Sequence, residues 1–184
     1  MRTAFLGAAL LAALLPTAAA QAPASFFVEP SAGVAWVLGE PTPTVGVRAG
    51  RASAAGFGYD FGVDAALRSV ETHTPSGHLD ASVDRLVRGS AALRYGGALL
   101  PRVRYDLGAA VAAGTTDALD CDGGDACVGT GLFLGVGPEV GLTAVLTGRL
   151  GLRLAATYAH SVSPGGPDGL SGLALGVGLR TSLR

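Results

Sequence analysis

The chain closes on the stretch LALGVGLRTSLR, from Leu173 to Arg184, in which apolar residues alternate with Gly, Ala, Ser or Arg. Successive side chains of a β-strand point to opposite faces, so this period of two predicts a strand with one apolar face and one small or polar face. The alternation suits both a soluble barrel with an apolar core and a membrane barrel with an apolar exterior. The composition of the second face has to decide between them.

The same period of two recurs along the chain and predicts eight strands, because Gly at alternate positions would cost a helix about 1 kcal/mol each time. The strands are expected at about 26–38, 44–52, 54–70, 83–95, 99–113, 128–142, 149–160 and 170–183. The connections near 53–54, 96–98 and 146–148 are short, whereas 71–82, 114–126 and 161–169 are long and only 40–43 is short on that side. Transmembrane barrels sort their loops in this way, with tight periplasmic turns and longer outward loops.

The N-terminus predicts export. Arg2, an apolar run from Ala4 to Leu15 and the small residues at 18–20 indicate a cleaved signal peptide over 1–20, which leaves one domain over 21–184. No segment offers the roughly 20 apolar residues that a membrane-spanning helix needs. The chain is nearly neutral, contains no Lys and has no basic cluster, so nucleic acid is not an expected partner. Because the signal predicts an oxidising compartment, Cys121 and Cys127 are expected to form a disulfide.

The face opposite the apolar residues consists of Gly, Ala and Ser with isolated Arg, Asp or Glu. A water-exposed face has no reason to be restricted to small residues, but the interior of an eight-stranded barrel is just wide enough for its own side chains. The second face is therefore predicted to fill a narrow polar lumen, and the apolar face to contact outer-membrane lipid. Near the strand ends, outward aromatic residues fit the interfacial girdles of such barrels: Phe26, Trp36, Tyr95 and Tyr158.

Four arginines and four carboxylates lie on the inward face away from the short turns. Charges removed from water need partners, and the guanidinium fork suits carboxylates, so we expect a structural plug of ion pairs. Folding the strands about their short turns places Arg48 near Asp60, Arg88 near Asp106, and Arg153 diagonally near Glu139. The complete predicted network consists of Arg48, Asp60, Asp64, Arg88, Arg104, Asp106, Glu139 and Arg153.

The chain resembles the small outer-membrane β-barrel family that includes the OmpA membrane domain, OmpX and OmpW. The resemblance is strongest in GVGPEVGLTAVLTGRLGLRLAATYAHS, from Gly135 to Ser161, and in the closing GLALGVGLR. It implies an all-β, eight-stranded, antiparallel up-and-down transmembrane barrel, inserted in the outer membrane by the barrel-insertion machinery. Members usually end on an aromatic residue, whereas this chain ends in Ser182-Leu183-Arg184.

The sequence supports a catalytic or metal-binding role less well than it supports a structural barrel. His160 and Ser161 are adjacent on a strand and point to opposite faces, so they do not form a base and nucleophile pair, and the position of Ser163 does not match the His-x-Ser-Asn arrangement of lipid A deacylase barrels. His73 and His78 are expected to be solvated. A Gly-rich loop carries four carboxylates that could hold Ca²⁺, although their spacing does not match a calcium-loop pattern: Asp117, Asp120, Asp122 and Asp125.

The sequence thus predicts a non-enzymatic outer-membrane barrel without a cofactor or metal, with a structural or surface-interaction role. A surface ligand would bind through the long loops, since loops differ from the rigid wall that carries them. The alternatives are a narrow channel for small or hydrophobic solutes, a soluble periplasmic barrel with its apolar face inward, and a lipid-modifying enzyme.

Overall fold

The computed structural model describes residues 25–52, 56–73, 75, 79–121, 127–162 and 171–183. The predicted signal peptide over 1–20 lies outside them. The described elements are all strands, and within these residues no helix is long and apolar enough to cross a membrane. In chain order they are β1 (Ser25–Val37), β2 (Glu40–Ala52), β3 (Gly56–Ala66), β4 (Val70–His73), β5 (Leu79–Leu100), β6 (Val103–Cys121), β7 (Cys127–Val145), β8 (Leu150–Val162) and β9 (Gly172–Leu183).

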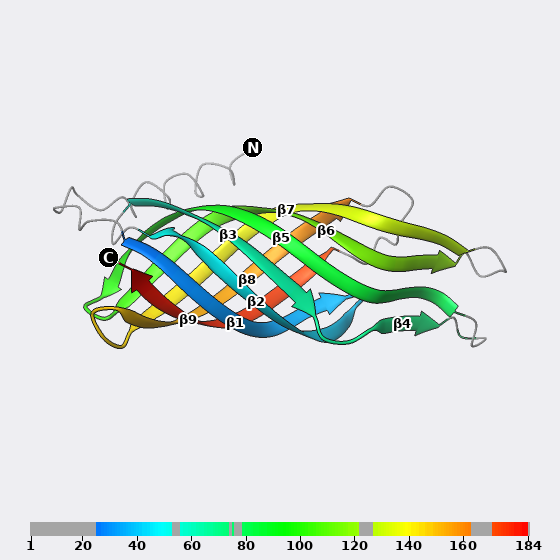
Figure 1. Ribbon diagram of the computed structural model, residues 1–184, viewed down its shortest axis with the longest axis horizontal. Coiled ribbons are helices and arrows are strands. Elements are labelled where there is room, and N and C mark those ends of the chain that lie inside the picture. The colour runs from blue at the N-terminus through cyan, green and yellow to red at the C-terminus, as the bar shows by residue number, and fades with distance from the viewer. Residues whose placement is uncertain are drawn as a thin grey trace, which may run out of the picture.

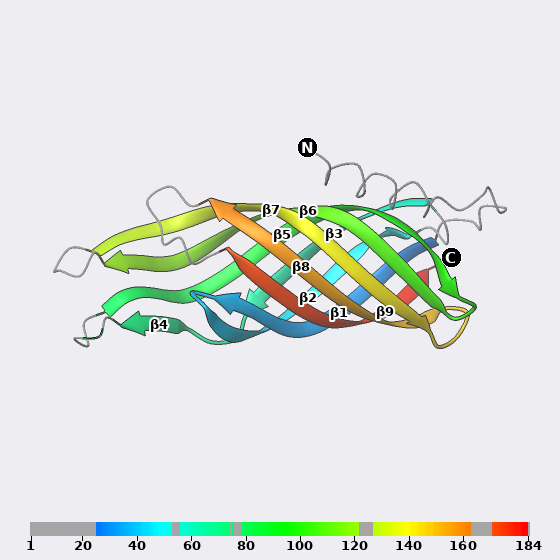
Figure 2. The same cartoon turned by 180° about the vertical axis from the view of Figure 1, so that it is seen from behind.

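Antiparallel pairing closes the sheet into a barrel, as Figures 1 and 2 show from opposite sides. Each strand pairs with the next along the chain except β3, which pairs with β5 instead of β4, and β9 pairs with β1. Strand β4 continues the line of β3 along the same partner, β5, so the nine strands form an eight-stranded barrel. This confirms the predicted architecture. Closure leaves no free strand edge in the wall, which a bilayer requires.

The turn between β1 and β2 is shorter than predicted. The sequence interpretation placed a connection at 40–43, but β2 already begins at Glu40, and Leu38 and Gly39 alone form the turn, with φ of 50° and 80°. Positive φ at both central residues is the geometry of a type I′ hairpin, whose twist matches that of its strands. Pro41 and Pro43 are tolerated in β2 because its pairing with β3 starts only at Thr44.

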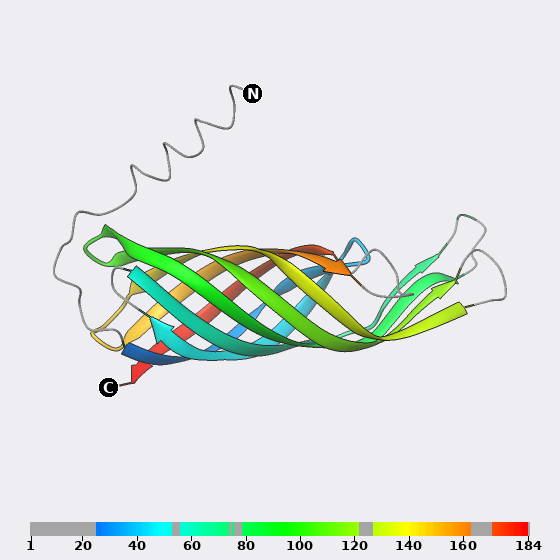
Figure 3. The same cartoon turned by 90° about the horizontal axis from the view of Figure 1, so that it is seen from above.

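Two predicted loops are largely strand. Most of 71–82 belongs to β4 and β5, and residues 114–121 belong to β6, while 122–126 lie outside the described residues. With 22, 19 and 19 residues, β5, β6 and β7 exceed the roughly 9 to 11 residues that span a bilayer. The outer parts of β4, β5, β6 and β7 form a four-stranded sheet that projects beyond the barrel (Figure 3), which we call the projecting sheet. Register shifts at Val83/Leu86 and Thr115/Ala118 mark β-bulges near its base, where such irregularities bend strands.

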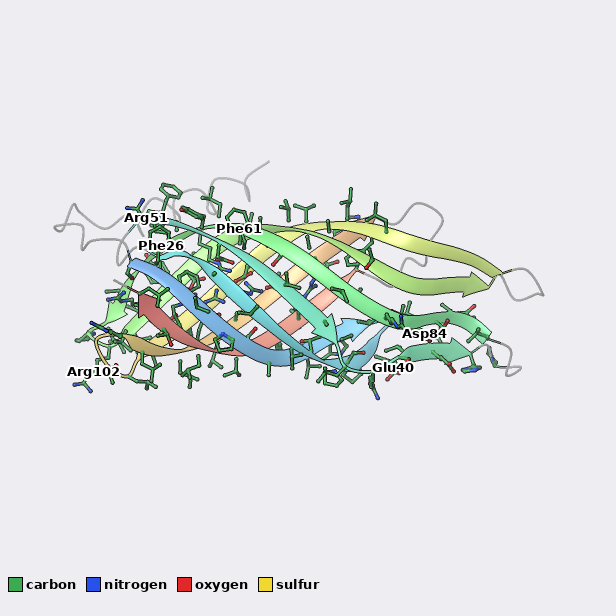
Figure 4. All side chains as sticks on the ribbon, in the orientation of Figure 1. Phe26, Glu40, Arg51, Phe61, Asp84 and Arg102 are labelled. Carbon is green, nitrogen blue, oxygen red and sulfur yellow. The ribbon has the colours of Figure 1, made fainter. Side chains whose placement is uncertain are left out.

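Burial is the reverse of that in a soluble protein. Large apolar side chains cover the outer wall, where Phe57 is 70% and Leu154 53% exposed, while Glu139 and Arg153 inside the barrel are each 1% exposed. Figure 4 shows apolar side chains standing off the outside of the strands. The apolar face therefore points outward to lipid, and the soluble alternative with an apolar interior is wrong.

The predicted aromatic residues all have the outward parity. Phe26 and Tyr158 are exposed and Trp36 is half-buried, while Tyr95 packs edge-on against Phe57 at 5.2 Å between ring centroids. Phe26 and the Phe57–Tyr95 pair lie near the end that carries the short turns, so this rim has the aromatic residues of a membrane interface.

The described part of the lumen holds one apolar cluster, which the sequence interpretation did not anticipate. It lies at the end away from the short turns, where Phe133 of β7 is 3% exposed and packs with inward residues of β1, β4 and β5. We call this cluster the outer plug: Ala35, Val37, Val70, Val83, Leu86 and Phe133. These residues have the inward parity of their strands, so they close the outer end of the lumen rather than contact lipid.

Candidate functional site

Inside the barrel, Glu139 of β7 forms ion pairs with arginines of three other strands. Its Oε2 lies 3.0 Å from Nη1 of Arg48 on β2, and its Oε1 lies 2.8 Å from Nη2 of Arg94 on β5. Nη2 of Arg153 on β8 also donates to Oε1, at 2.8 Å. Three cations around one buried carboxylate require further negative charge nearby, because an unpaired buried charge is costly.

Asp60 and Asp106 supply part of that charge. Nη2 of Arg94 donates to Oδ1 of Asp60 at 3.0 Å, and Nη1 of Arg48 lies 3.9 Å from the same oxygen. Arg153 holds Asp106 with two donors, Nη2 at 2.6 Å from Oδ1 and Nε at 3.3 Å from Oδ2. Such bidentate contacts fix the geometry of both partners.

Glu29 of β1 extends the network toward the short-turn end. It is 2% exposed and accepts a hydrogen bond of 2.7 Å from Nε of Arg180 on β9. The Arg180 guanidinium also lies over the ring of Phe27, 4.1 Å from its centroid. Nη1 of Arg153 lies 3.6 Å from the other oxygen of Glu29, which joins this pair to the rest.

Arg88 and Asp64 form a separate pair nearer the outer plug. Nε of Arg88 donates to both carboxylate oxygens at 3.1 and 3.2 Å, and Nη2 lies 2.9 Å from Oδ2. We call this pair together with the charges around Glu139 the lumen network. It contains equal numbers of cations and anions and has no net formal charge: Arg48, Arg88, Arg94, Arg153 and Arg180 with Glu29, Asp60, Asp64, Asp106 and Glu139.

Glycines on the inward face make room for these long side chains. A Cβ at Gly141 would lie 2.6 Å from Oδ2 of Asp106, and one at Gly178 would lie 2.7 Å from Oε1 of Glu29. At Gly62 it would lie 2.8 Å from Cγ of Arg48. Small residues therefore alternate with charged ones because the interior has no space for two large neighbours.

Little empty space remains along the lumen. A cavity of about 50 Å³ lies between Arg48 and Arg88, and one of about 20 Å³ lies beside Phe133 of the outer plug. A third, of about 100 Å³, opens at the short-turn mouth. Volumes of this order hold a few water molecules.

The structure brings most of the predicted lumen residues together. Arg48 reaches Asp60 at 3.9 Å, although Glu139 is its nearer partner, and Arg153 contacts Glu139 at 2.8 Å as expected for a diagonal pair. Arg104 differs. It has the inward parity but is exposed two residues after the Pro101-Arg102 turn, and within the described residues it makes no ion pair.

The expected pairing of Arg88 with Asp106 is wrong, because the turn before β6 lies further along the chain than predicted. The sequence interpretation put that turn near 96–98, whereas the strands continue to Leu100 and the chain turns at Pro101-Arg102. When a turn moves along the chain by a few residues, the partner of each residue on the next strand moves by twice that number of residues. Arg88 therefore faces Gly114 on β6 and finds Asp64 on its other side.

Glu29, Arg94 and Arg180 belong to the network but are missing from the prediction. All three have the inward parity of their strands, which was the signal available in the sequence. The prediction left them out because it counted only inward charges away from the short turns. In a narrow barrel, long side chains reach along the lumen, so charges near the mouth join the same network.

The loop candidates are only partly described. Cys121 and Cys127 are direct cross-strand partners at the tip of the projecting sheet, and their disulfide stays a prediction. The side chains of Asp117 and Asp120, together with Asp122, Asp125, His78 and Ser163, lie outside the described residues. His73 is exposed on β4, and Nδ1 of the exposed His160 lies 3.4 Å from Oγ of Ser171.

Three solved structures of outer-membrane or surface proteins are similar to this fold. Neisserial surface protein A matches with a TM-score of 0.58 and 14% identity, over 90% of this chain and 100% of that one. A major outer membrane protein from Thermus thermophilus matches with a TM-score of 0.53 and 18% identity, over 88% and 100%. Ail, the attachment invasion locus protein of Yersinia pestis, matches with a TM-score of 0.50 and 10% identity, over 87% and 97%.

No family model matches the sequence, and no curated protein sequence matches it. The structural matches establish the fold, and the apolar outer wall with its charged interior fits the same placement. The chain is therefore an eight-stranded β-barrel of the outer-membrane type, as the sequence predicted.

Proposed function

We propose that the protein is a non-conducting, non-enzymatic outer-membrane barrel that presents its projecting sheet to partners outside the cell. The observation that carries the proposal is the filled lumen. The network around Glu139 and the outer plug around Phe133 follow one another along the barrel, and the cavities beside them measure about 50 and 20 Å³. A solute would have to break buried ion pairs to pass.

The projecting sheet supports the surface role. Pairing between β7 and β8 begins at Leu134, so the outer part of β7 has no strand partner on that side among the described residues. Strand β4, at the opposite margin, pairs with β5 and with no other described strand. Unpaired strand edges can accept an extended peptide through main-chain hydrogen bonds. The projecting sheet thus offers a partner two strand edges, which a short turn between barrel strands does not.

The non-enzymatic part of the proposal rests on the geometry of a Ser–His contact outside the lumen. Ser171 Oγ and His160 Nδ1 lie 3.4 Å apart in an exposed position, beyond the usual length of a hydrogen bond between a hydroxyl and a ring nitrogen. Catalytic pairs are normally held within about 2.6 to 3.2 Å and oriented by a third group.

Conductance tests the closed lumen. The folded protein is reconstituted in planar bilayers, and we expect no unitary current steps from the wild type. Regular steps that depend on the protein would support the channel alternative and contradict the proposal.

Labelling of intact cells tests which end is outside. In a C121S/C127S background, single cysteines replace exposed Asp80 on the projecting sheet or exposed Thr147 in a short turn. A membrane-impermeant maleimide should label D80C on intact cells, and T147C only after lysis. The reverse pattern would place the projecting sheet in the periplasm and refute the surface role.

A further inference from the structure

The two ends of the barrel carry opposite charge. The three short connections with their flanks, 49–59, 95–105 and 140–152, contain four arginines and no Asp or Glu: Arg51, Arg102, Arg104 and Arg149. The connections at the other end, 38–45, 66–87, 114–131 and 161–171, contain nine Asp or Glu and two arginines. Figure 4 shows Arg51 and Arg102 at one end of the molecule and Glu40 and Asp84 at the other.

The arginines at the short-turn end are not neutralised by any carboxylate of the part of the chain that the structure describes. The lumen network is already balanced, so its five carboxylates are committed to its own five arginines. Arg51, Arg102, Arg104 and Arg149 are exposed, and none pairs with a carboxylate among the described residues. Their positive charge is therefore available to an anion that is not part of the protein.

The cavity at the short-turn mouth concentrates this charge. It measures about 100 Å³ and is lined by three of the rim arginines together with two from the lumen network: Arg51, Arg104, Arg149, Arg94 and Arg180. Its only acidic lining residues are Asp60 and Asp106, which pair with Arg94 and Arg153. Nη2 of Arg180 is buried without a hydrogen-bond partner, which leaves a donor unused beside the cavity. Nε of Arg94 also makes no hydrogen bond, but it lies 3.6 Å from Oδ1 of Asp106.

We infer that this mouth is a binding site for a phosphate-type oxyanion. Guanidinium groups bind phosphate oxygens through paired, charge-assisted hydrogen bonds, and the cavity has room for a group of that size. Phe26 and the Phe57–Tyr95 pair place the same rim at the level of lipid headgroups. The oxyanion is either the phosphate of a phospholipid in the adjacent leaflet or free phosphate from the periplasm.

The test compares wild type with R104Q/R149Q and with R102Q, all folded in detergent. Arg102 is the matched control, because it is an exposed arginine of the same rim that does not line the cavity. Binding of inorganic phosphate is measured by calorimetry at about 0.15 M NaCl, where diffuse surface attraction is screened. Native mass spectrometry then measures retention of phosphatidylglycerol against phosphatidylcholine of the same chain length. Heat-modifiable mobility on SDS gels checks that each variant is folded.

We expect the wild type to bind one of the two probes, and R104Q/R149Q to weaken that binding by about tenfold or more, since two charge-assisted contacts are lost. R102Q should stay within about twofold of wild type. Binding of phosphate alone identifies the free anion, and selective retention of phosphatidylglycerol identifies the headgroup. Equal weakening by R102Q, or no binding of either probe to the folded wild type, would overturn the inference.

Discussion

Replacing Glu139 with Gln should destabilise the barrel more than any other single loss of a lumen carboxylate. Glu139 is 1% exposed and contacts Arg48, Arg94 and Arg153 at 3.0, 2.8 and 2.8 Å. Removing one partner of a buried ion pair costs about 3 to 5 kcal/mol, because the remaining charge stays buried. Gln keeps one acceptor oxygen, so we expect the free energy of unfolding to fall by about 3 kcal/mol, the lower end of that range.

Urea unfolding followed by the fluorescence of Trp36, the single tryptophan, measures this loss. Asp64→Asn is the matched control, since it also removes one carboxylate but from a pair whose side chains are both 18% exposed. That variant should lose less stability than E139Q, because it leaves one arginine rather than three without its carboxylate and both side chains of the pair keep some contact with solvent. The double variant E139Q/R48Q restores a neutral lumen and should recover part of the stability lost in E139Q. A loss in E139Q no greater than in D64N, or a double variant less stable than E139Q, would refute the reasoning.

Three further substitutions and one chemical measurement probe the rest of the structure. Gly141→Val should reduce the folded fraction, seen as loss of the heat-dependent gel shift, because its side chain would overlap Asp106; a folded variant of wild-type stability would contradict the packing argument. Phe133→Ala should lower the free energy of unfolding by about 3 to 5 kcal/mol, with urea titration as the readout and a change below about 1 kcal/mol as the contrary result. Leu154→Arg on the lipid face should cost about 2 to 4 kcal/mol in a bilayer, and an unchanged stability there would mean that this face does not contact lipid. Intact mass before and after reduction should differ by the two hydrogens of a Cys121–Cys127 disulfide, and equal masses would exclude it.

The exposed arginines at the short-turn end give the protein a candidate function, oxyanion binding, that the buried lumen network does not provide. Arg104 was expected inside the ion-pair plug, yet it is exposed at the mouth beside Arg149. Because of this position, Arg104 is a candidate contact for phosphate rather than a structural charge of the lumen network. At the outer end, exposed Glu40 and Asp84 give the surface around the projecting sheet an acidic character.

The sequence by itself determined the architecture and the direction of each face. The period of two in segments such as Leu173–Arg184 specifies strands, and the restriction of one face to small residues with a few charges identifies a narrow interior. Even Glu29, Arg94 and Arg180 could have been assigned to the lumen from parity alone. These features depend on how apolar and small or polar residues alternate along each strand, which can be read directly from the sequence.

Only the tertiary structure decided which charges meet, where the strands end and what closes the outer mouth. Arg88 pairs with Asp64 rather than Asp106 because the register of two strands depends on where the chain turns, and Pro101-Arg102 turns later than the glycines at 96 and 97 suggested. The outer plug assembles Val37, Leu86 and Phe133 from three distant strands. Such contacts form only when the sheet closes, because closure brings together residues that are far apart along the chain and whose proximity cannot be read from the sequence.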